Sequence, residues 1–133
     1  MEKILHFDKL AKLIDSTLSS AWETVSRLEE IMMSKNFYEE GQDTSFIEEE
    51  EAHMNVLLEN YIQELYIQIL FFLNFHELSD LVEKLNNDYR NFEDRFTELQ
   101  MTNFTSVLYS PCLEMINKYI KVIKEIVAES NTN

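Results

Sequence analysis

Two places in this sequence hold residue types at spacings that could do chemistry. Glu50 and His53 stand three positions apart, as in the Glu-x-x-His pairs that bind metal ions in carboxylate-bridged helical bundles. Such a site needs a second pair of this kind and two more inward glutamates. Leu73 stands three residues before His76, and no acid stands three residues before His6. A metal-binding bundle is therefore a secondary hypothesis, and we assign no metal-binding residue.

The second place is Cys112, which follows Pro111 at a predicted helix start. A helix N-terminus lowers the pKa of a thiol and so favours the nucleophilic thiolate. No histidine lies near Cys112 in the sequence, so we favour a small buried residue over a nucleophile. With one glycine, the chain also has no glycine-rich phosphate loop. We expect no catalytic residue, no cofactor and no enzymatic activity.

The strongest chemical pattern in the sequence is acidic. Seven of the thirteen residues from Glu39 to Glu51 are acidic. Carboxylates at a helix start interact favourably with the helix dipole, by about 0.3–1 kcal/mol each, which would explain residues 48–51 without any ligand. The alternative is a docking surface for a basic partner, because complementary charge speeds association and selects the partner. On that interpretation the residues that contact the partner are Glu39, Glu40, Asp43, Glu48, Glu49 and Glu51.

The overall charge narrows the classes of partner. The chain has 25 acidic and 11 basic residues, which give a net charge of −14. This charge disfavours direct binding to nucleic acid and to anionic membranes. The apolar stretch Leu65–Phe75 is shorter than the roughly 20 residues that span a bilayer. A single cysteine and an N-terminus without an apolar signal region fit a reducing cytoplasm, so we expect a cytoplasmic protein.

Composition and periodicity predict an all-α fold. One glycine and one proline in 133 residues leave little material for tight turns, while 45% hydrophobic residues are enough for a core. Apolar residues recur at threes and fours, as one face of a helix requires. We predict one domain over residues 1–133, a bundle of four to five helices with a frayed tail from about residue 129. The helix at residues 46–74 is apolar almost all round, so we place it at the centre.

Helix boundaries follow from capping residues. Ser45 and Glu48 form a capping-box pattern, which predicts Ser45 as the N-cap. Ser110 and Pro111 predict the start of the last helix, with proline at its first position. Whether residues 75–80 form a turn or a kink within one long helix is left open by the sequence.

The function that these patterns favour is a non-enzymatic acidic module that docks on a basic protein. An inhibitor, an immunity or antitoxin partner, or a helical subunit of an assembly would fit. Aromatics and methionines are so numerous that we expect four helices to leave some of them uncovered, which predicts an exposed apolar patch and raises the hypothesis of a homodimer. They cluster beside the first loop and again at Phe71, Phe72, Phe75, Phe92, Phe96, Met101 and Phe104. The residues in question near that loop are Met32, Met33, Phe37 and Tyr38.

An alternative is a nucleic-acid mimic that fills the basic groove of a nucleic-acid-binding enzyme. It requires carboxylates along one face at a density like that of duplex phosphates, about one charge per 1.7 Å. Lys84, Arg90 and Arg95 interrupt the acidic series of the third helix, and interleaved basic residues count against mimicry. The acidic residues of that series are Glu77, Asp80, Glu83, Asp88, Glu93, Asp94 and Glu98.

Overall fold

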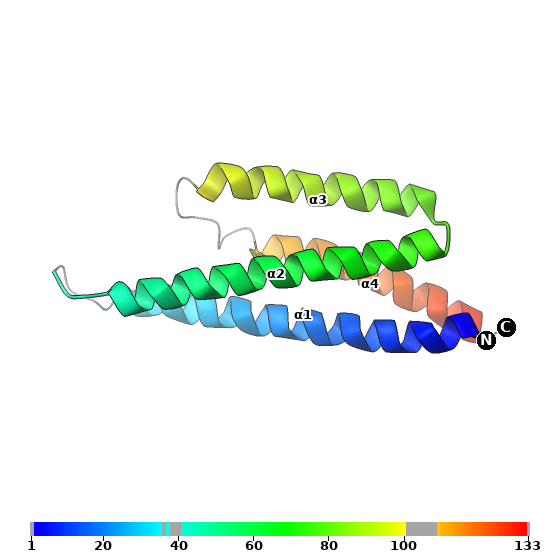
Figure 1. Cartoon of the computed structure of the whole chain (residues 1–133), viewed down its shortest axis with the longest axis horizontal. Coiled ribbons are helices and arrows are strands. Elements are labelled where there is room, and N and C mark those ends of the chain that lie inside the picture. The colour runs from blue at the N-terminus through cyan, green and yellow to red at the C-terminus, as the bar shows by residue number, and fades with distance from the viewer. Residues whose placement is uncertain (1, 36, 38–40, 101–108, 133) are drawn as a thin grey trace.

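The computed structural model describes residues 2–35, 37, 41–100 and 109–132. They form four α-helices, named α1 (Glu2–Lys35), α2 (Ser45–Phe75), α3 (Ser79–Gln100) and α4 (Tyr109–Thr132), as Figure 1 shows. The described part of the chain contains no strand. The predicted all-α class is therefore confirmed, with four helices rather than five.

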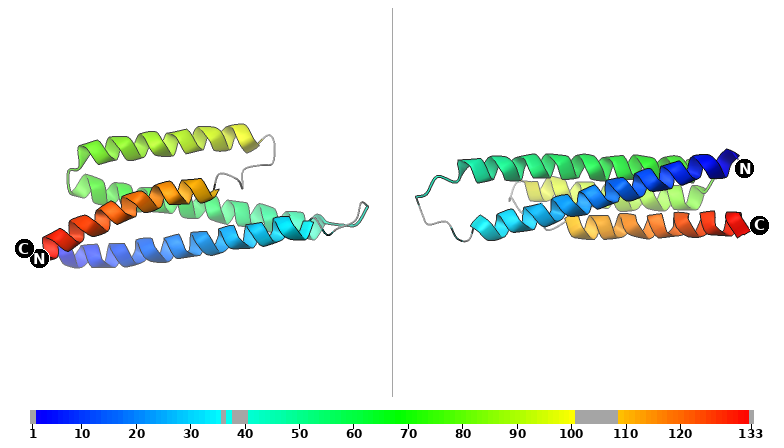
Figure 2. Two further views of the ribbon diagram at one scale, coloured as in Figure 1. Left: turned by 180° about the vertical axis from the view of Figure 1, so that it is seen from behind. Right: turned by 90° about the horizontal axis from the view of Figure 1, so that it is seen from below.

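The four helices lie side by side along the long axis of the molecule (Figures 1 and 2). α1 and α2 form a long antiparallel hairpin, and α4 packs against both of them. α3 lies along α2, on the side away from α1, and also contacts α4. The central position predicted for α2 is correct, since α2 contacts each of the other helices.

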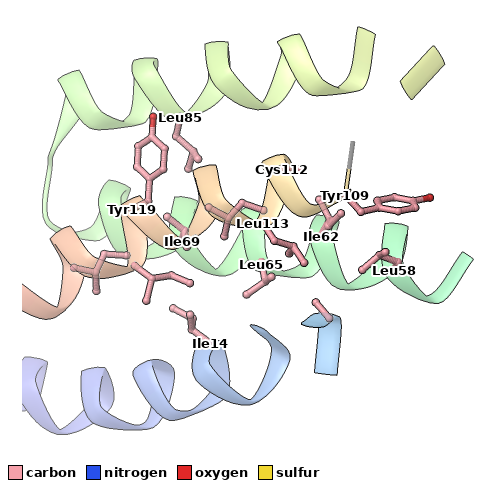
Figure 3. Close-up of a cluster of buried hydrophobic side chains, with 14 of the residues drawn as sticks. Ile14, Leu58, Ile62, Leu65, Ile69, Leu85, Tyr109, Cys112, Leu113 and Tyr119 are labelled. Carbon is pink, nitrogen blue, oxygen red and sulfur yellow. The ribbon is translucent and has the colours of Figure 1, made fainter. Parts of the chain in front are cut away.

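The core forms where the apolar faces of the helices meet (Figure 3). α2 supplies a series of buried residues spaced by three and four, as one face of a helix requires. α3 supplies a single fully buried residue, Leu85, among its described residues. The main buried residues of the other helices are Ile14, Ala21, Val25 and Leu28 on α1, Leu58, Ile62, Leu65 and Ile69 on α2, and Cys112, Leu113, Ile116 and Ile123 on α4.

Most apolar side chains of α3 that pack against the core are only half-buried, and aromatic and polar contacts also hold this helix in place. The Tyr66 hydroxyl of α2 donates a hydrogen bond to Asn86 Oδ1, and the Tyr66 ring stacks on Tyr89 with centroids 3.9 Å apart. On the other side, the Tyr119 hydroxyl of α4 donates to Asp88 Oδ2 over 2.6 Å. These contacts join α3 to both α2 and α4.

The predicted N-cap of α2 is wrong. α2 begins at Ser45 itself, and the capping position falls on Thr44, whose carbonyl accepts the N–H groups of Ile47 and Glu48 at 3.0 Å. Asp43 Oδ1 accepts the Ser45 N–H over 3.0 Å. An aspartate that bonds the backbone two residues ahead forms a local turn of its own. The helix therefore starts one residue earlier than the capping-box pattern indicates.

The segment left open by the sequence is a turn. α2 ends at Phe75, and the Leu78 N–H donates back to the Leu73 carbonyl over 2.9 Å. Glu77 adopts φ +57°, a left-handed conformation that is uncommon outside glycine and costs a non-glycine residue about 1–2 kcal/mol. This turn reverses the chain and sends α3 back along α2.

The start of α4 also differs from the prediction. The helix begins at Tyr109, so Ser110 lies inside it and Pro111 is its third residue. Proline is tolerated there because the first four N–H groups of a helix have no intrahelical partner. α4 continues to Thr132, through most of the segment for which we expected a frayed end.

Candidate functional site

The loop end of the α1–α2 hairpin extends past the neighbouring ends of α3 and α4 (Figure 1). We call residues 29–34, Phe37 and residues 41–51 the hairpin tip. α1 has 34 residues and α4 has 24. A difference of this size corresponds to roughly 15 Å at 1.5 Å per residue. Of the described helices, only α1 and α2 build this end of the molecule.

Apolar side chains are left exposed at the hairpin tip. Ile31 and Ile47 are buried there, outside the cluster that forms the main core. Met33 is 64% exposed, Phe37 85% and Phe46 64%. A helix with a single neighbour can bury only one face, so apolar residues on its other faces remain in water. The expectation that four helices would not cover every aromatic and methionine is confirmed here.

The predicted acidic residues lie on the same tip. Asp43, Glu48 and Glu49 are exposed, and Glu51 is half-buried. Glu39 and Glu40, the other two predicted contact residues, lie outside the described residues. No ion pair joins Asp43, Glu48 or Glu49 to another described residue. The tip therefore combines unneutralised carboxylates with exposed apolar side chains.

Asp43 has a structural role as well as a charge. Hydrogen bonds from the Ser45 side chain and backbone N–H lower the pKa of the Asp43 carboxyl, because both favour the ionised form. Asp43 is thus ionised at neutral pH while it holds the first turn of α2.

Glu50 belongs to an ion-pair network with α1. Arg27 donates from Nε to Glu50 Oε1 over 2.7 Å, and from Nη1 to Glu30 Oε2 over 3.0 Å. Hydrogen bonds to the two carboxylates raise the pKa of Arg27. Glu50 is therefore neutralised within the hairpin, unlike its acidic neighbours at positions 48 and 49. Sequence reasoning missed this pair because its members lie 23 positions apart.

The metal hypothesis gains no support from this geometry. His53 is exposed, and Glu50 is occupied by Arg27. No group of three or more His, Cys, Asp or Glu side chains that could hold a metal ion lies among the described residues.

Cys112 is a core residue. Its side chain is 0% exposed, and burial raises the pKa of the thiol to about 12. The expected direction of this pKa shift, downward at a helix start, is wrong because desolvation of the thiolate dominates. The favoured interpretation of Cys112 as a small buried residue is confirmed. A thiol protonated at neutral pH is a poor nucleophile.

The acidic residues of α3 do not form an unbroken negative ridge. Lys84, Arg90 and Arg95 are exposed among them. Asp88 is half-buried and bonded to Tyr119. This interleaving counts against nucleic-acid mimicry.

A second apolar surface lies on α2. Ile67, Phe71 and Phe75 are 50–64% exposed and recur every four residues, and we call them the α2 stripe. The Phe71 and Phe75 rings stack with centroids 6.3 Å apart. By length and composition α2 could cross a membrane, a criterion that the core helix of a soluble bundle also meets. The α2 stripe offers a surface for the predicted homodimer, which stays a prediction.

Comparisons with family models, with curated proteins and with solved structures found no match to this chain. The case for a function therefore rests on its own surfaces.

Proposed function

We propose that this chain is a non-enzymatic protein-binding module whose hairpin tip docks on a basic, amphipathic segment of a partner protein. The observation that carries this proposal is the exposure of Met33, Phe37 and Phe46 on the same tip as the exposed acidic residues Asp43, Glu48 and Glu49. Protein interfaces combine an apolar centre with a polar rim, and exposed apolar patches mark such surfaces. The tip has both components.

The charge of the tip favours a basic partner. The hairpin tip holds seven acidic residues and no lysine or arginine; the acids are Glu29, Glu30, Asp43, Glu48, Glu49, Glu50 and Glu51. Arg27 neutralises only Glu30 and Glu50 among the nearby described acids. A concentrated negative field speeds encounter with a positive surface and disfavours acidic competitors. Lysines and arginines on the partner would face Asp43, Glu48 and Glu49, and its apolar side chains would cover Met33, Phe37 and Phe46.

An inhibitor, an immunity or antitoxin protein and a helical subunit of a larger assembly would each use such a surface. The buried thiol of Cys112 and the exposed, unclustered position of His53 support a binding role over a catalytic one.

A charge-reversal experiment tests the proposal. The tip variant carries Asp43→Lys, Glu48→Lys and Glu49→Lys. A matched control carries Glu83→Lys, Asp94→Lys and Glu98→Lys on α3, where the three acids are also exposed. Each protein is immobilised and used to capture partners from a lysate of the native host, after circular dichroism has verified its helical content.

We expect wild type and control to retain a common basic protein that the tip variant loses. Exposed charge pairs contribute about 0.2–1 kcal/mol each, so the triple reversal should weaken binding by about tenfold or more. Binding of wild type should also weaken as salt rises. Equal capture by the tip variant and wild type would rule out the tip as the docking surface.

A further inference from the structure

A groove runs between α3 and α4, on surfaces that the proposed docking mode does not use. Its volume is about 350 Å³. Half-buried apolar side chains, among them Leu81, Phe92 and Met115, contribute to its lining. Small-molecule sites in proteins have volumes of about 300–1,000 Å³ and mostly apolar linings with a few polar groups. The groove lies at the lower end of that range.

Three cationic side chains also line this groove. Lys84 and Arg95 come from α3 and Lys118 from α4, and all three are exposed. None of them forms an ion pair with another described residue, whereas Arg27 and Lys124 do. In a chain with 11 basic against 25 acidic residues, three unneutralised cations in one groove are a strong local departure from the overall charge.

The acid within the groove is already engaged. Asp88 is the one acidic residue among the described residues that line it, and it accepts the hydrogen bond from the Tyr119 hydroxyl over 2.6 Å. The positive charge of Lys84, Arg95 and Lys118 therefore exceeds the negative charge of the lining.

The cations are spread along the groove. Lys84 and Arg95 lie eleven positions apart on α3, which is about 16 Å along a helix. The Asp88–Tyr119 bond sets α3 against α4 in antiparallel register and places Lys118 at a level between them. Such a row fits an elongated ligand better than a compact ion.

The total charge of the molecule limits the size of that ligand. At physiological salt, charges are screened over about 8 Å, so a small anion in the groove is influenced mainly by the nearby cations. A nucleic acid or an acidic protein would extend beyond the groove and meet the rest of a surface whose net charge is −14. A ligand with one or two negative charges avoids that repulsion.

We propose that the α3–α4 groove binds an elongated amphipathic organic anion, of the chemical class of a medium-chain carboxylate. Its apolar chain lies on Phe92 and Met115 and runs on toward Leu81, and its carboxylate pairs with a cation at one end of the row. Arginine matches a carboxylate in bidentate geometry, so Arg95 is the preferred partner of the head group, with Lys118 next to it along the groove.

The test uses decanoate as the probe and calorimetry to measure its affinity, with decanol as the uncharged comparison. The groove variant is Arg95→Gln with Lys118→Gln. The matched control is Arg90→Gln with Lys121→Gln, which removes the same two residue types from the same helices at exposed positions that do not line this groove.

We expect decanoate to bind wild type and the control with affinities within about twofold, and the groove variant about tenfold more weakly. Decanol should bind wild type more weakly than decanoate does.

In heteronuclear NMR spectra, decanoate should shift the signals of backbone amides in α3 and α4. The proposal is overturned if wild type does not bind decanoate, if the groove variant binds as well as the control, or if the shifts are confined to the hairpin tip. The tip variant should bind decanoate like wild type, so the two proposals fail separately.

Discussion

The Cys112→Ala variant should be less stable than wild type at neutral pH and more stable than wild type at alkaline pH. Cys112 is 0% exposed in the core, and burial raises the pKa of its thiol from the usual 9.0 to about 12. At neutral pH the thiol is protonated in both the folded and the unfolded chain. The substitution then removes only buried volume, and a loss equivalent to about one methylene costs about 1 kcal/mol.

Above pH 9 the difference in stability between wild type and Cys112→Ala changes. The unfolded chain releases the thiol proton first, so the free energy of unfolding of wild type falls by about 1.4 kcal/mol per pH unit. This loss continues until the pH approaches the folded-state pKa of about 12. Alanine cannot ionise. The advantage of wild type should therefore vanish near pH 10, and at pH 11 the alanine variant should be more stable by roughly 2 kcal/mol.

Urea unfolding followed by far-ultraviolet circular dichroism, at pH 7, 9, 10 and 11 with reductant, measures this crossing. Burial also raises the pKa of Tyr89 to about 12, so both proteins lose stability in alkali and only their difference is informative. Ile123→Val is the matched control: Ile123 is 1% exposed on the same helix, and its variant loses one methylene without losing a titratable group. A difference between wild type and Cys112→Ala that stays constant with pH, as expected for Ile123→Val, would refute the desolvation argument.

Two further substitutions test how α3 is held. Leu85→Ala removes the one fully buried side chain among the described residues of α3 and should cost about 2–5 kcal/mol in urea unfolding; a cost below about 1 kcal/mol would mean that α3 is held by polar contacts alone. Tyr119→Phe removes the hydrogen bond to Asp88 and should cost about 1 kcal/mol at pH 7. Burial and that hydrogen bond raise the pKa of Tyr119, so wild type should lose the stability gained from the hydrogen bond as the pH rises above 10. If the free energies of unfolding of wild type and Tyr119→Phe fell equally with pH in this range, that expectation would be contradicted.

The sequence predicted what depends on local periodicity. The stretch at residues 46–74 is apolar almost all round, which identified the central helix, and its residues Leu58, Ile62, Leu65 and Ile69 are buried in the structure. Alternation of apolar and polar residues along one segment needs no knowledge of the rest of the fold. For the same reason the turn at residues 76–78 was beyond prediction, since its hydrogen bonds reach back to carbonyls of the preceding helix.

Features that depend on how the helices are placed relative to one another could not be predicted from the sequence. The Arg27–Glu50 pair depends on the register of α1 against α2, and the Tyr119–Asp88 bond on that of α4 against α3. Lys84 and Arg95 could be read in the sequence only as interruptions of an acidic series. Their shared groove with Lys118 exists because two antiparallel helices bring them together. The acidic hairpin tip could be predicted because its residues are nearly contiguous.

The topology of four antiparallel helices has a mechanical consequence. α1 begins and α4 ends at the same pole of the molecule, and the loop between α1 and α2 lies at the other (Figure 1). Over its 34 residues α1 acts as a stiff rod of about 50 Å. If either terminus were joined to a surface, a label or a neighbouring protein, this rod would keep the exposed side chains of Phe37 and Phe46 at the far end, away from the attachment.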